Sequence, residues 1–98
     1  MRDVVVVDSV RTGLAKSFRG TFNLTRPDDM VAHCINALLE RNPTLDPVEV
    51  EDVIVGAASQ TGEQGGNIAR LAVILSQLPI TTAGSTISRA CSSGLNSI

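Results

Sequence analysis

The sequence predicts an α/β fold in which strands and helices alternate in the order β-α-β-α-β-(α) and form a mostly parallel sheet. The apolar fraction of 43% and the charged fraction of 18% are typical of a globular domain. β-Branched runs alternate with stretches of helical periodicity along the 98 residues. The first run contains four consecutive valines, and unbroken apolar runs are typical of strands covered on both faces, as in parallel sheets.

The first strand is predicted over Asp3 to Asp8, which holds the four valines. The first helix is predicted from about Pro27 to Arg41, because apolar residues recur on one face at helical spacing and Asn42-Pro43 ends the pattern. We expect Thr25 to cap this helix. Asp28 places negative charge at the positive end of the helix dipole.

The second half of the chain repeats the alternation. A second strand is predicted over Val53 to Ala57, and a second helix over about Asn67 to Leu78. That helix is apolar over so much of its circumference that we expect it between two layers or at an interface. A third strand follows over about Thr82 to Ser88, and the start of a third helix follows over Cys91 to Ile98, where the pattern is cut off.

Charge and composition exclude several kinds of partner. Eight basic and ten acidic residues give a net charge of −2, and the basic residues are scattered, so we expect no nucleic-acid partner. The apolar runs are too short to span a bilayer, and no secretory signal is evident, so we expect no membrane partner and a cytoplasmic location. In a reducing compartment the two cysteines stay unpaired.

The predicted strands and helices do not form a complete domain. A three-stranded parallel sheet with a third helix of about two turns would leave apolar strand faces in water. We therefore expect residues 1–98 to be an incomplete domain, either a fragment or one chain of a complex.

Cys91 is the candidate catalytic residue. It follows the third predicted strand directly, at the edge of a parallel sheet where ligands bind. At a helix N-terminus the dipole favours the thiolate, and the main-chain N–H of Cys91 is free to stabilise an oxyanion. From geometry alone, the alternative of a small buried cysteine at a tight turn stays equally open.

The other candidates have simpler interpretations. His33 lies away from the apolar stripe of the first helix and is expected in solvent, whereas Cys34 lies on the stripe and is expected to pack. Adjacent helical positions face different sides, so the two do not form a metal site, and no metal is expected. The loop Gln60 to Gly66 lacks the Lys-Ser/Thr pair of a phosphate-binding loop.

The segment Ser88 to Ile98 resembles the active-site segment of the thiolases, the acetyl-CoA acyltransferases, in which its Cys is the nucleophile. Ser88 stands where many members carry Asn, which leaves the acyl-chain preference open. Four further segments resemble the family in the same order: Val4 to Gly13, Ser17 to Phe22, Val53 to Gly56 and Gln64 to Arg70.

The resemblance implies the N-terminal portion of a thiolase-like layered α/β fold. It implies an acyltransferase of fatty acid metabolism that cleaves or forms 3-ketoacyl-CoA, with Cys91 as acyl-thioester nucleophile and its main-chain N in an oxyanion hole. Coenzyme A and acyl-CoA would be substrates, with no permanently bound cofactor. The family's catalytic His and second Cys lie downstream, so activity is expected only with the remaining C-terminal part, in a homodimer or homotetramer.

Two alternatives remain. A ketoacyl-synthase-type condensing enzyme of the same superfamily shares the fold and the nucleophilic Cys, although its surrounding residues usually differ from Cys-Ser-Ser-Gly-Leu. A non-catalytic interaction module would instead dock on a partner through the second helix.

Overall fold

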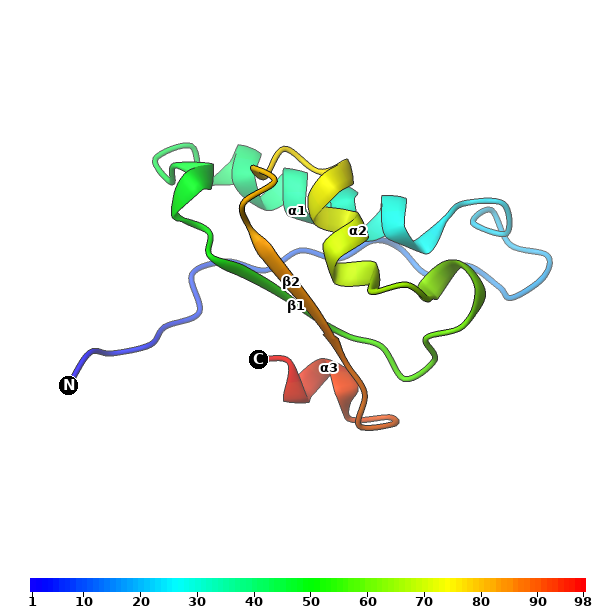
Figure 1. Cartoon of the computed structure of the whole chain (residues 1–98). Coiled ribbons are helices and arrows are strands. Elements are labelled where there is room, and N and C mark those ends of the chain that lie inside the picture. The colour runs from blue at the N-terminus through cyan, green and yellow to red at the C-terminus, as the bar shows by residue number, and fades with distance from the viewer.

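A computed structural model describes residues 1–98 (Figure 1). Two short 3-10 helices, η1 (Pro47–Glu49) and η2 (Gly62–Gln64), lie between the main elements. None of the helices has the length and apolar character needed to cross a bilayer. The main elements are α1 (Pro27–Arg41), β1 (Asp52–Gly56), α2 (Ile68–Leu75), β2 (Ala83–Ile87) and α3 (Ser93–Asn96).

The sheet consists of β1 and β2, which run parallel as predicted. Asp52 lies opposite Ala83 and Gly56 lies opposite Ile87. The pairing continues past the end of β1, where the N–H of Ala57 donates to the carbonyl of Ile87 at 2.9 Å. Helix α2 connects the two strands, so both carboxyl ends lie at the same edge of the sheet.

The predicted first strand, Asp3 to Asp8, is wrong for this structure. No backbone hydrogen bond joins these residues to any other segment, and Val4–Val7 are between 71% and 98% exposed. All the ladder bonds of β1 go to β2, so the valine segment has no partner strand. An apolar run indicates that a segment will be buried against other residues. It forms a strand only where another backbone segment pairs with it through hydrogen bonds.

Asp8 nevertheless fixes the end of this segment to α1. Its Oδ1 lies 2.9 Å from Nη2 of Arg41, and its Oδ2 accepts from Nδ2 of Asn42 at 3.0 Å. The Asn42 amide, followed by the N–H of Ser9, holds the pKa of the Asp8 carboxyl below its usual range. The valines are thereby attached near the C-terminal end of α1 without being part of the sheet.

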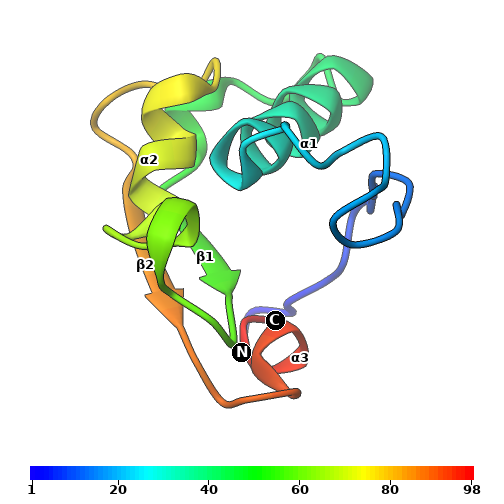
Figure 2. The same ribbon diagram turned by 90° about the vertical axis from the view of Figure 1, so that its right-hand side faces the viewer.

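Helix α2 contacts β1 and β2 on one side and α1 on another (Figure 2). Ile68, Ala69, Ala72 and Val73 are all at most 3% exposed, and they form the centre of the core. On its other side, α2 leaves Ile74 and Leu75 about half exposed.

Hydrogen bonds from side chains set both ends of α2. Asn67 precedes the helix in the left-handed region, with φ 60°, and its Oδ1 accepts from the N–H of Arg70. The helix ends at Leu75, three residues before the predicted end. There Ser76 Oγ donates to the carbonyl of Val73, and Asn36 on α1 accepts from the N–H of Gln77 at 2.7 Å.

The predicted cap of α1 is also wrong. Arg26, rather than Thr25, occupies the N-cap position, and no side chain caps the helix. Arg26 instead forms an ion pair with Asp28, at 3.0 Å between Nη2 and Oδ2 and 3.2 Å between Nε and Oδ1. Asp28 is 4% exposed, and the bond from Arg26 is the main cause of the lowered pKa of its carboxyl. The guanidinium also reaches Glu63 of η2 at 3.3 Å.

Candidate active site

Cys91 lies in a turn, Ser88–Ser92, between the end of β2 and the start of α3 at the carboxyl edge of the sheet (Figure 1). Its side chain is exposed, so it is not a buried packing cysteine. The helix predicted to begin at Cys91 begins two residues later in the structure, where α3 spans Ser93–Asn96. Cys91 therefore lies just before the N-terminal end of α3, next to the N-cap residue Ser92.

The turn is held by the side chain of Ser93, which is 3% exposed. Its Oγ accepts from the N–H of Arg89 at 2.7 Å and donates to the carbonyl of Ala90 at 2.6 Å. Ala90 has φ 48°, in the left-handed region that L-residues seldom adopt. Two bonds from one buried hydroxyl thus maintain a conformation that the backbone alone disfavours.

A glycine on the neighbouring strand makes room for this turn. Gly56 ends β1, and a Cβ at this position would overlap the main-chain carbonyl of Ser93 and approach the N of Gly94 to 2.6 Å. Only a residue without a side chain allows α3 to lie this close to β1. The turn that carries Cys91 is therefore supported from two elements, β1 beside it and α3 after it.

The main-chain N–H of Cys91 makes no hydrogen bond within the chain. The N–H groups of the next two residues, Ser92 and Ser93, donate to the carbonyls of Arg89 and Ala90. An exposed thiol and an unpaired N–H thus belong to the same residue. This is the donor that an oxyanion on a Cys91-bound carbon requires.

The structure does not bring the histidine of the chain to Cys91. His33, the single histidine, is exposed on α1 as predicted, and α1 lies far from α3 in both views (Figures 1 and 2). Cys34 is half-buried on the same helix, consistent with a packing role. No group of three or more His, Cys, Asp or Glu side chains is placed to hold a metal ion.

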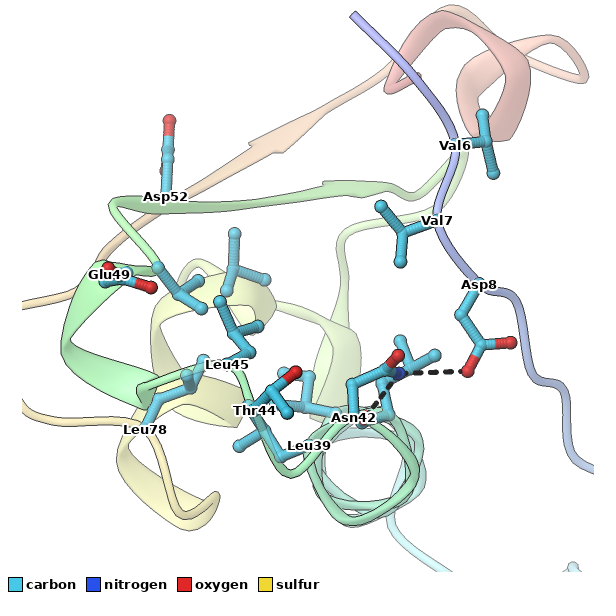
Figure 3. Close-up of a pocket in the computed structure, with 14 residues that line it drawn as sticks. Val6, Val7, Asp8, Leu39, Asn42, Thr44, Leu45, Glu49, Asp52 and Leu78 are labelled. Atoms are coloured by element: carbon cyan, nitrogen blue, oxygen red, sulfur yellow. Dashed lines mark hydrogen bonds between the residues drawn. The ribbon is translucent and has the colours of Figure 1, made fainter.

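A cavity of about 680 Å³ lies away from Cys91 (Figure 3). Val6 and Val7 border it on one side, Leu38 and Leu39 of α1 on another, and Val53 of β1 on a third. A second cavity of about 520 Å³ is formed mainly by residues 12–23. Cys91 lines neither of them, so neither is a chamber for a group bound to the thiol.

Comparison with known proteins agrees with this arrangement. The family model described as "Thiolase, N-terminal domain" matches residues 4–98. The chain belongs to the thiolase family. The family match begins within the valine segment and includes the Cys91 turn. Both segments of this thiolase chain therefore lie within the region that matches the family.

A solved structure gives the same result for the fold. The crystal structure of the Bacillus anthracis acetyl-CoA acetyltransferase matches this thiolase chain with a TM-score of 0.72 and 31% sequence identity. The match covers 82% of this chain and 20% of that chain. This thiolase chain therefore corresponds to about a fifth of the length of that protein.

The sequence pointed to Cys91 as the candidate residue, but not to Ser93 and Gly56, which hold its turn. Ser93 stands in Cys91-Ser92-Ser93, where nothing in the sequence distinguishes the buried serine from the exposed one. The contact at Gly56 could have been predicted, since a glycine that ends an apolar strand often marks a close approach of another backbone segment.

Proposed function

We propose that this chain supplies the nucleophilic cysteine of a thiolase that cleaves or forms 3-ketoacyl-CoA, acting together with the remainder of the enzyme. The observation that carries the proposal is Cys91 itself, an exposed thiol beside an unpaired main-chain N–H at the carboxyl edge of the sheet. Membership of the thiolase family supports the choice of reaction. So does the similarity to an acetyl-CoA acetyltransferase.

In the cleavage direction, the Cys91 thiolate attacks the C3 carbonyl carbon of the 3-ketoacyl-CoA. A C–S bond forms while the carbonyl π electrons move to oxygen, where the N–H of Cys91 donates a hydrogen bond. The alkoxide then collapses, the C2–C3 bond breaks, and its electron pair stays on C2. Protonation of C2 releases acetyl-CoA and leaves the shortened acyl group on Cys91 as a thioester.

In the second half-reaction, the thiolate of coenzyme A attacks the thioester carbon, and the bond to Cys91 breaks. Free enzyme and a shortened acyl-CoA result, in a ping-pong cycle in which coenzyme A and acyl-CoA are exchanging substrates. The groups that move protons belong, by the family resemblance, to the remainder of the enzyme. His33 is exposed on α1 and makes no hydrogen bond to Cys91.

The test is thiolysis of a 3-ketoacyl-CoA by the complete enzyme that contains this chain. Cys91→Ser should abolish turnover, because a serine hydroxyl is a far weaker nucleophile than a thiolate. Cys34→Ser is the matched control and should retain turnover. Full activity in Cys91→Ser would refute the proposal and leave a non-catalytic interaction module as the better account.

A second assay separates the condensing-enzyme alternative. Malonyl-CoA with an acyl-CoA as acyl donor, and a 3-ketoacyl-CoA with coenzyme A as acyl acceptor, are offered side by side. The proposal predicts products only from the 3-ketoacyl-CoA and coenzyme A. Chain elongation from malonyl-CoA would favour the ketoacyl-synthase type.

A further inference from the structure

The two bonds of the Ser93 hydroxyl have a specific geometric consequence for the proposed oxyanion donor. The carbonyl of Ala90 and the N–H of Cys91 belong to the same peptide unit, which is planar and trans. In such a unit the C=O and the N–H point in opposite directions. The group that fixes the direction of the Ala90 carbonyl therefore also fixes the direction of the Cys91 N–H.

Ser93 is that group. Its Oγ donates to the Ala90 carbonyl at 2.6 Å, and its own N–H donates to the same oxygen at 3.2 Å. This carbonyl is thus held toward α3, and the N–H of Cys91 points away from α3, where it has no partner in the chain. The hydroxyl also accepts from the N–H of Arg89, so its orientation is itself fixed.

We propose that Ser93 is a positioning residue, whose buried hydroxyl orients the Ala90–Cys91 peptide so that the Cys91 N–H faces the reacting carbonyl oxygen. The proposal deepens the proposed acyl transfer and rests on it. Ser93 does not touch the substrate in this account. It acts through the peptide unit that carries the donor.

The chain contains a matched control for this bond. Ser97 Oγ donates to the carbonyl of Gly94 at 2.6 Å, the same length and the same three-residue spacing as the bond from Ser93 to Ala90. The Ser97 bond lies after the turn that carries Cys91, residues 88–92, and fixes no peptide in that turn. Ser97→Ala thus removes an equivalent hydroxyl bond and leaves the Cys91 peptide untouched.

The experiment compares two reactions of the same sulfur in the complete enzyme. Acetylation of Cys91 by acetyl-CoA passes through an oxyanion, whereas alkylation by iodoacetamide is a direct displacement that forms none. Ser93→Ala should slow acetylation about tenfold to a hundredfold, as loss of orientation at a reacting centre does. Alkylation of Cys91 should be unchanged, and Ser97→Ala should leave both rates unchanged.

Two further readouts exclude a purely structural role. Cys34 in α1 reports opening of the core, and its alkylation rate should stay the same in Ser93→Ala. Ser93→Thr keeps the hydroxyl and should restore much of the acetylation rate. Equal loss of acetylation and alkylation, or faster labelling of Cys34, would overturn the proposal, as would normal acetylation in Ser93→Ala.

A measurement on the unmodified enzyme is independent of how the variants fold. Amide-resolved hydrogen exchange should find the Arg89 N–H protected by Ser93, and the Cys91 N–H unprotected. Exchange of the Arg89 N–H at the rate of a free peptide would overturn the proposal. Failure of the proposed function is seen separately, as absence of acetylation at Cys91 in the unmodified enzyme.

Discussion

Gly56 at the end of β1 lies in backbone contact with Ser93 in the only turn of α3, so closely that any Cβ at position 56 would overlap the Ser93 carbonyl. This contact joins the sheet edge to the turn that carries Cys91. Strand β1 therefore supports the turn that carries Cys91, although Cys91 follows the other strand in sequence.

We expect Gly56→Ala to displace α3, because the new methyl group meets backbone that cannot rotate away. Overpacking of this kind costs roughly 1–3 kcal/mol of stability. Hydrogen exchange of the α3 amides in the complete enzyme should accelerate, and acetylation of Cys91 should slow. Gly13→Ala is the control, because a Cβ there meets nothing within 4 Å. Unchanged exchange in α3 would contradict the close contact.

Asn67 combines a left-handed backbone with a helix cap, and two substitutions separate these roles. Asn67→Gly keeps the backbone conformation and loses the side-chain bonds to Arg70, Thr86 and Gly84. Asn67→Ala loses both. We expect Asn67→Ala to cost about 1–2 kcal/mol more, the price of the left-handed conformation for a non-glycine residue. Hydrogen exchange in the first turn of α2 measures the difference, and equal effects would be inconsistent with φ 60° at this position.

Acid should weaken the start of α1. The pKa of Asp28 is lowered in the folded state, mainly by its bond from Arg26, so its ionised form stabilises the fold. This contribution is complete above the ordinary carboxyl pKa and is lost as the pH falls through the lower folded-state value. Asp28→Asn should therefore be less stable than the parent at pH 7 and lose less on acidification.

Urea unfolding of the complete enzyme between pH 3 and 7 measures this effect. Asp29→Asn is the matched control, since Asp29 is exposed and its side chain makes no ion pair. It should follow the parent. If the two variants behave alike, the Arg26–Asp28 pair does not stabilise the fold.

The apolar surface predicts the behaviour of the isolated chain. Nine of the 98 residues are buried, while Val4–Val7 and several core-type side chains such as Ile74 and Ile80 are more than half exposed. Contiguous apolar surface of this kind favours association. We expect residues 1–98 alone to self-associate and to melt without cooperativity, as measured by sedimentation and calorimetry. A monomer that melts cooperatively would show that this core is sufficient.

The elements that could be predicted from sequence are those specified by local residues. Helix α1 begins at Pro27 and ends at Arg41 as predicted, because the apolar stripe and the prolines lie within or beside it. The end of α2 could not be predicted, because it depends on a distant residue. The side chain of Asn36 accepts a hydrogen bond from the N–H of Gln77, 41 residues further along the chain. The valine segment was assigned wrongly, since pairing depends on a partner and not on the run itself.

The same distinction, between features set by neighbouring residues and features set by distant ones, applies to the site. The place of Cys91 after a strand could be predicted, because the strand that precedes it and the small residues that follow it are adjacent in sequence. The contact between Gly56 and Ser93 joins residues on different elements, and burial of Ser93 rather than Ser92 depends on how α3 packs. The first residue of α3 was predicted two positions too early, at Cys91 instead of Ser93.

Peptide mapping of the complete enzyme after incubation with acetyl-CoA tests the central claim most directly. The account predicts one acetyl group, on Cys91 as a thioester, and its removal on addition of free coenzyme A. An unmodified Cys91, or an acetyl group carried by Cys34 or any other residue instead, would contradict it.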